Sequence, residues 1–221
     1  MNNELKRLEA LIMHHFKTEP FHNLPMIFGE HLRGHVPGGT CSDKTLSFIK
    51  DATAEGFDAS LHSAKIGGRE IHRLARLCID DHVYFVDIGN GWPSIKPYPA
   101  HVEVFYRCFN MRFRTEIRDQ TIDVFHQRNG RDIVQMQIDI NPRLAQDIMK
   151  DVTNRFDSGI VYPFTNSVRF SKIVGDRFLF LRGEHLEIYR ENCFDRISAL
   201  QRTDVFDVLK KYFNINATTF C

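Results

Sequence analysis

The sequence predicts an α+β protein with a helical N-terminal part, a central antiparallel β-barrel or sheet, and a small C-terminal α/β lid. Two observations carry this prediction. Apolar residues recur at helical spacing in the first 52 residues, whereas from residue 59 to 140 they alternate with polar residues at the period of a strand. The order of helices, then a run of antiparallel strands, then a mixed tail predicts three contiguous domains: 1–57, 58–140 and 141–221.

Two amphipathic helices are expected before residue 57. The first spans 3–16 and ends at Pro20, and its apolar stripe comprises Leu5, Leu8, Leu11, Ile12 and Phe16. The second stops before Gly56, and its stripe comprises Leu46, Phe48, Ile49 and Ala52. It follows the Gly38-Gly39 turn, so Cys41 should lie at or near its N-terminus.

Strands are expected throughout the central segment. They cover 59–66, 70–79, 83–88, 102–109, 112–118, 121–128 and 132–140. Asn129-Gly130 separates the last two and favours a two-residue hairpin. Asn141 and Pro142 then predict the cap and first residue of a helix. Further strands at 167–174, 177–182 and 184–190 and a helix at 203–213 complete the C-terminal part.

The composition is that of an ordinary soluble globular protein, and it excludes several classes. Of 221 residues 26% are charged and 43% apolar, and 29 Lys and Arg balance 28 Asp and Glu. A general nucleic-acid-binding protein would be strongly basic, and no apolar run approaches the ~20 residues that cross a bilayer. The N-terminus alternates charged and apolar residues, unlike a secretory signal. We therefore predict a cytoplasmic protein without nucleic-acid or membrane partners.

Cysteine usage points to one reactive thiol. The five cysteines are scattered and include no Cys-x-x-Cys pair, which argues against a disulfide framework or a zinc ribbon. Free thiols are expected in a reducing compartment. Among them Cys41 stands out, because the dipole and unpaired N–H groups of a helix N-terminus favour a thiolate.

A histidine and an aspartate are available to this thiol. His72 and Asp87 lie on neighbouring expected strands, joined by a turn near Asp80. If the turn centres there, two residues face each other across the strands when their numbers sum to about 159, as 72 and 87 do. If the sum differs by two, the two residues are diagonal neighbours and still lie on the same face of the sheet. A carboxylate beside an imidazole fixes its tautomer and supports the imidazolium. Cys41, His72 and Asp87 therefore predict a nucleophilic triad.

Each of these residues also has a plainer explanation. A buried cysteine is usually a small apolar side chain, a strand histidine is often a polar rim residue, and an aspartate before glycine often belongs to a turn. Cys78 shares a strand face with His72, but six residues of strand place it about 20 Å away. His31 and His35 have the i, i+4 spacing of metal ligands, yet a nearby glycine and proline disfavour a helix, so we predict no metal site.

Several motifs resemble those of the arylamine N-acetyltransferase family. Residues 38–41 (GGTC) resemble the family's Arg-Gly-Gly-x-Cys, and residues 86–91 (VDIGNG) resemble its Val-Asp-Val-Gly-Phe-Gly. Residues 20–24 (PFHNL) are similar to its Pro-Phe-Glu-Asn-Leu, and the His-to-Asp spacing and the tail from 166 to 215 also fit. Three residues depart from the family pattern by replacing its Arg, Glu and Phe: Pro37, Asp43 and Asn90.

The resemblance implies a ping-pong acyl transfer. Cys41 would attack the thioester of acetyl-CoA or another acyl-CoA, with His72 as the base and Asp87 holding His72. A small-molecule amine or arylamine would then accept the acyl group. Backbone N–H groups at the start of the Cys41 helix would stabilise the oxyanion. The substrate-binding residues would be Phe21, Asn90 and Trp92.

The same triad fits two other functions. A transglutaminase-like thiol hydrolase or transamidase, or an amide synthase acting on a carrier-bound acyl chain, would use it with a different donor. A catalytically silent relative would keep the fold with an unactivated Cys41.

Overall fold

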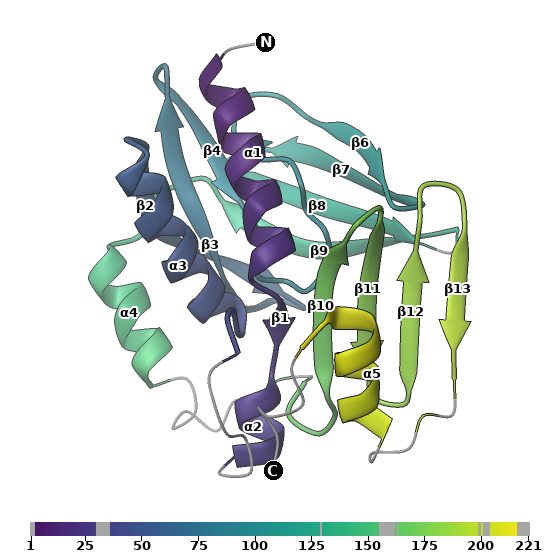
Figure 1. Cartoon of the computed structure of the whole chain (residues 1–221). Coiled ribbons are helices and arrows are strands. Elements are labelled where there is room, and N and C mark those ends of the chain that lie inside the picture. The colour runs from purple at the N-terminus through teal and green to yellow at the C-terminus, as the bar shows by residue number, and fades with distance from the viewer. Residues whose placement is uncertain are drawn as a thin grey trace.

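The computed structural model describes residues 3–29, 36–128, 130–154, 162, 164–198, 200 and 204–215. These residues include the helices α1 (Asn3–Thr18), α2 (Leu24–Phe28), α3 (Cys41–Ala54), α4 (Ala145–Thr153) and α5 (Val205–Phe213). α1 and α3 are the two amphipathic helices expected from the sequence. They contact each other, and their buried apolar faces join the main core of the molecule (Figure 1). None of the helices in these ranges is long and apolar enough to span a membrane.

The central strands form one curled, antiparallel sheet. Its members are β2 (Asp58–Ile66), β3 (Arg69–Ile79), β4 (His82–Val86), β5 (Tyr98–Pro99), β6 (Phe105–Cys108), β7 (Met111–Arg118), β8 (Thr121–Arg128) and β9 (Arg131–Asp139). The strand order is β5-β4-β3-β2-β9-β8-β7-β6, and α3 packs on β2 and β3 (Figure 1). The predicted α+β class with a central antiparallel sheet is confirmed.

The C-terminal strands form a second sheet beside the first. They are β10 (Arg169–Val174), β11 (Arg177–Arg182), β12 (His185–Tyr189) and β13 (Phe194–Ile197), with β1 (Phe21–His22) at the edge next to β10. α5 covers one face of this sheet, where Phe213 meets Phe170 edge to face (Figure 1). β1 comes from the N-terminal segment and also bridges Phe21 to Gly39, so it ties the second sheet to the turn before Cys41.

Some element bounds differ from the prediction. α4 begins at Ala145 with Leu144 as its cap, so Asn141 and Pro142 do not open it. Instead, the backbone and side-chain N–H groups of Asn141 donate to Asp139 Oδ1 and close a turn after β9. β5 and β13 were not expected. Asn129 lies outside the described residues, as do His31, His35 and Cys221. The pairing of Arg128 with Arg131 has the register that the predicted two-residue hairpin requires.

Candidate active site

The turn before α3 holds the predicted nucleophile rigidly. Cys41 is the first residue of α3, and the Asp43 carboxylate accepts hydrogen bonds from the N–H and the hydroxyl of Thr40 at 2.9 and 2.8 Å. Gly38 has φ +89°, and a Cβ there would lie 2.0 Å from the carbonyl oxygen of Pro20. The Gly-Gly turn is therefore required both by its backbone conformation and by the close approach of the chain. The aspartate at position 43, where the family motif has Glu, still forms this cap.

His72 and Asp87 meet as diagonal neighbours. The β3–β4 register pairs Ala75 with Val86, so paired residue numbers sum to 161 rather than 159. That is the slip of two under which both side chains stay on one face. His72 Nε2 lies 2.8 Å from Asp87 Oδ1, and both side chains are buried. The predicted contact between the two residues is therefore present in the structure.

Cys41 completes the cluster. Burial raises the pKa of its thiol, but its interactions with His72, and after those with Arg73, lower that pKa. Because Nε2 faces Asp87, Nδ1 is the nitrogen left for the thiol. The structure thus brings Cys41, His72 and Asp87 together in the order that a thiol nucleophile needs.

Electrostatics around this cluster favour a thiolate–imidazolium pair. Burial alone would lower the pKa of His72, but the charge and hydrogen bond of Asp87 raise it to about 10. Burial alone would raise the pKa of Cys41, yet the hydrogen bond and charge of His72, followed by the backbone and charge of Arg73, bring that pKa below its usual range. The proton is therefore expected on the imidazole rather than on the sulfur.

The three predicted substrate-binding residues lie close to the triad in different settings. The Phe21 ring meets the Phe164 ring edge to face, with 6.2 Å between the ring centroids. Asn90 Nδ2 donates to Asp87 Oδ2, and Asn90 Oδ1 accepts from the Trp92 N–H at 2.6 Å. The amide of Asn90 thus orients the Asp87 carboxylate, and its contact with substrate stays a prediction.

Trp92 lies between the two sheets. It is 5% exposed, and its ring contacts His126 of β8 and Phe180 and Tyr189 of the second sheet. Its role in substrate binding also stays a prediction.

A small cleft opens at the sulfur. It is lined by Thr40, Cys41, Ser42, Ile71, Arg73, Val152, Tyr162 and Phe164. Arg73 was not expected here, because successive strand residues point to opposite faces. Its side chain curls back so that Nη1 donates to the carbonyl of His72 at 2.9 Å. The residues that α4 and the following segment bring to the cleft carried no motif from which the sequence could have identified them.

A model of the N-acetyltransferase family matches residues 4–220. The chain belongs to the N-acetyltransferase family. The match covers nearly the whole chain and confirms the family that the sequence motifs predicted. No curated protein sequence matches the chain significantly.

The fold of this N-acetyltransferase is similar to that of several solved structures. It is similar to arylamine N-acetyltransferase from Nocardia farcinica, with 23% identity, a TM-score of 0.79 and coverage of 96% of this chain and 83% of that one. It is also similar to arylamine N-acetyltransferase of Mycobacterium marinum in complex with CoA, with 16% identity, a TM-score of 0.78 and coverage of 97% and 88%. At these identities the likeness establishes a shared fold.

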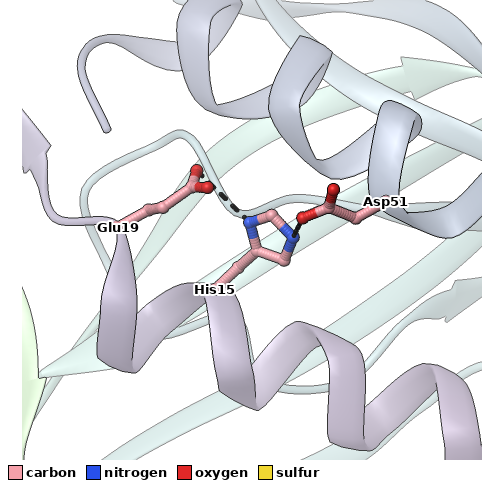
Figure 2. Close-up of side chains that lie close together, drawn as sticks. All are labelled: His15, Glu19 and Asp51. Atoms are coloured by element: carbon pink, nitrogen blue, oxygen red, sulfur yellow. Dashed lines mark ion pairs between the residues drawn. The ribbon is translucent and has the colours of Figure 1, made fainter. Parts of the chain in front are cut away.

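One cluster in this N-acetyltransferase has the composition of a metal site. His15, Glu19 and Asp51 each offer a ligand atom, all within 4.8 Å of one another. Figure 2 shows, however, that the two ring nitrogens of His15 face different carboxylates, Nδ1 toward Glu19 at 3.3 Å and Nε2 toward Asp51 at 3.2 Å. A metal bound at one nitrogen would therefore face away from the second carboxylate. We interpret the cluster as a polar contact between α1 and α3.

The shifted pKa values of this N-acetyltransferase predict its thiol chemistry. Iodoacetamide should alkylate Cys41 rapidly at pH 6, well below the pKa of a free cysteine, roughly 8.5. The rate should stay nearly flat up to the pKa of His72, about 10. Intact-protein mass spectrometry with peptide mapping measures the rate. In His72→Asn the dependence should revert to that of an ordinary thiol. A wild-type rate that rises steadily from pH 6 to 9 would contradict the ion pair.

Proposed function

We propose that this N-acetyltransferase moves an acyl group from acyl-CoA to an amine by a ping-pong route, with Cys41 as nucleophile, His72 as base and Asp87 as the residue that positions His72. The observation that carries the proposal is the cluster at the N-terminus of α3, where Cys41 is the first residue, His72 lies 2.8 Å from Asp87, and His72 lowers the pKa of the Cys41 thiol against the effect of burial. Its support beyond the site is membership of the family, since the reaction that the family name describes needs an activated nucleophile or base.

The first half-reaction transfers the acyl group to sulfur. The Cys41 thiolate attacks the thioester carbonyl, and the charge that develops on the carbonyl oxygen faces the N–H groups at the start of α3. The carbon–sulfur bond to CoA then breaks. The departing CoA thiolate takes the proton from the His72 imidazolium, so that a Cys41 thioester and a neutral imidazole remain.

The second half-reaction regenerates the enzyme. An amine attacks the Cys41 thioester and transfers its proton to neutral His72. The carbon–sulfur bond to Cys41 breaks, which leaves the amide product and restores the thiolate–imidazolium pair. We propose an arylamine as the acceptor for two reasons. The similar solved structures are arylamine N-acetyltransferases, and the aromatic side chains of Tyr162 and Phe164 in the cleft suit a flat ring.

The test of this proposal is acylation of the protein itself. Mixing with acetyl-CoA should release one equivalent of CoA and add one acetyl group, which peptide mapping should place on Cys41. Cys78→Ser is the matched control, because this half-buried cysteine lies on β3 away from the cluster, and it should acylate as the wild type does. Acylation by peptide amides or carrier thioesters but not by CoA esters would favour the transglutaminase-like alternative. No acylation by any of these donors would favour a silent relative.

A further inference from the structure

Three arginines converge where the two sheets meet. Arg169 on β10 and Arg182 on β11 are directly opposite each other in the antiparallel register. Arg128, the last residue of β8 in the other sheet, stacks over the Trp92 ring at 4.0 Å, and Arg182 lies over the same ring at 5.7 Å. The indole is thus a common platform for Arg128 and Arg182, which come from different sheets.

This cluster carries excess positive charge. Like charges directly opposite in a sheet destabilise it, so the Arg169–Arg182 pair has a local cost. Burial, followed by the charge of Arg182, lowers the pKa of Arg128, and burial and then Arg182 also lower that of Arg169. Glu187 is the one acidic side chain of the described residues that acts on both arginines, and it already accepts from Arg182 at 3.5 Å and from the Tyr189 hydroxyl at 3.0 Å.

One guanidinium nitrogen of the cluster also lacks a hydrogen-bond partner. Nη1 of Arg128 is buried and has no hydrogen-bond partner within the described ranges. A buried guanidinium N–H left unpaired costs free energy, whereas arginine clusters bind phosphate through bidentate, charge-assisted hydrogen bonds. The excess charge and the unpaired donor both favour a polyanionic ligand at this place.

The cluster is near the reacting sulfur but outside its cleft. Trp92 follows Gly89 by three residues, at most roughly 11 Å of chain, and Gly89 packs directly against Cys41. None of the three arginines lines the cleft at Cys41. A ligand that uses both places must therefore carry its anionic group away from its reacting carbonyl, as acyl-CoA does through its pantetheine arm. A compact anionic acceptor would not.

We propose that Arg128, Arg169 and Arg182 bind the phosphate groups of the acyl donor. The inference rests on the proposed function, because it assigns part of the donor to a second place on the protein. Trp92 then acts as the platform that aligns two of the guanidinium groups, so this predicted substrate-binding residue would serve the donor indirectly.

The experiment compares three donors that carry the same thioester: acetyl-CoA, S-acetyl-4′-phosphopantetheine and S-acetylpantetheine, which has no phosphate. The rate of Cys41 acylation at subsaturating donor is measured for the wild type and for Arg128→Gln, Arg169→Gln and Arg182→Gln. Arg112→Gln is the matched control, because Arg112 is an exposed arginine on β7. Each rate is measured at low and at high salt, since a charge-based site weakens as ionic strength rises.

Each cluster variant should slow acylation by acetyl-CoA by about ten- to a hundredfold and leave S-acetylpantetheine within about twofold of the wild type. S-acetyl-4′-phosphopantetheine should fall between them, and Arg112→Gln should match the wild type. Equal slowing with all three donors would overturn the proposal, because the arginines would then only support Trp92 and its loop. Unchanged rates with acetyl-CoA would also overturn it.

A failure of the proposed function would look different, since no thioester would then acylate the wild type. In that case calorimetric titration with inorganic pyrophosphate decides the matter. Binding by the wild type and Arg112→Gln that is lost in the cluster variants would support the phosphate site. Equal binding by all proteins, or no binding by any, would refute it.

Discussion

Asp87→Asn should lower the rate of Cys41 acylation by about 10³- to 10⁴-fold, the largest loss that we expect from a change of so few atoms. The carboxylate accepts from His72 at 2.8 Å and from the Gly89 N–H at 3.1 Å, and it is fully buried. An amide keeps the size but removes the charge that raises the pKa of His72 to about 10. The proton then returns to the Cys41 sulfur, and the nucleophile is lost.

The rate of acylation by acetyl-CoA and the pH profile of alkylation measure this effect together. In Asp87→Asn the alkylation of Cys41 should shift toward alkaline pH, which a merely structural defect would not cause. Asp81→Asn is the matched control, because this exposed turn residue has φ +61°, a conformation that asparagine adopts readily. An Asp87→Asn rate within tenfold of the wild type would show that the carboxylate does not support catalysis.

A second variant separates hydrogen bonding from charge. In Asp87→Asn the new amide would place a donor against Asn90 Nδ2, which now donates to Asp87. The double variant Asp87→Asn, Asn90→Asp restores an acceptor there and can still receive the Trp92 N–H. We expect it to recover most of the free energy of unfolding, as measured in urea, while acylation stays slow because the charge no longer adjoins His72. Full recovery of the rate would indicate that packing, not charge, limits the single variant.

Local chemistry explains why the proximity of Cys41, His72 and Asp87 could be predicted from the sequence. A cysteine after Gly-Gly at a helix start, and two strands joined by a turn at Asp80, constrain the three residues with only a small register uncertainty. Asp80 and Asp81 both adopt positive φ and form that turn, which sets the sum of paired numbers to 161. A change of two in the sum of paired numbers keeps every side chain on the same face of the sheet. The difference between the predicted and observed register therefore does not separate His72 from Asp87.

Features that depend on distant contacts could not be predicted. β1 pairs with β10 across about 150 residues, and no local pattern indicates that pairing. The Arg128–Arg169–Arg182 cluster depends on how two separate sheets meet. Asn90 was predicted as a substrate-binding residue, which stays a prediction, but the hydrogen bond of its amide to Asp87 was not expected. An amide side chain can serve either role, and only its neighbours decide between them.

Gly89→Ala should disable the site by steric displacement. A Cβ at position 89 would lie 2.6 Å from Cys41 Cα and 2.9 Å from Cys41 Cβ, and the first of these is a backbone atom that cannot rotate away. The loop that carries Asp87 and the N-terminus of α3 must then move apart. Overpacking of this kind costs about 2–3 kcal/mol in the free energy of unfolding. A shift of about 1 Å between nucleophile and base costs roughly a further hundredfold in rate.

Urea unfolding and acylation by acetyl-CoA measure the two effects separately. Gly67→Ala is the control, because Gly67 has φ +57° and nothing near its Cβ position, so alanine there should cost only about 1 kcal/mol of backbone strain. Gly67→Ala should lose stability and keep its acylation rate, whereas Gly89→Ala should lose both. Gly89 is thus required because the loop that carries Asp87 packs directly on Cys41. Wild-type acylation in Gly89→Ala would show that the two segments can separate without cost, and that this packing does not set the geometry of the triad.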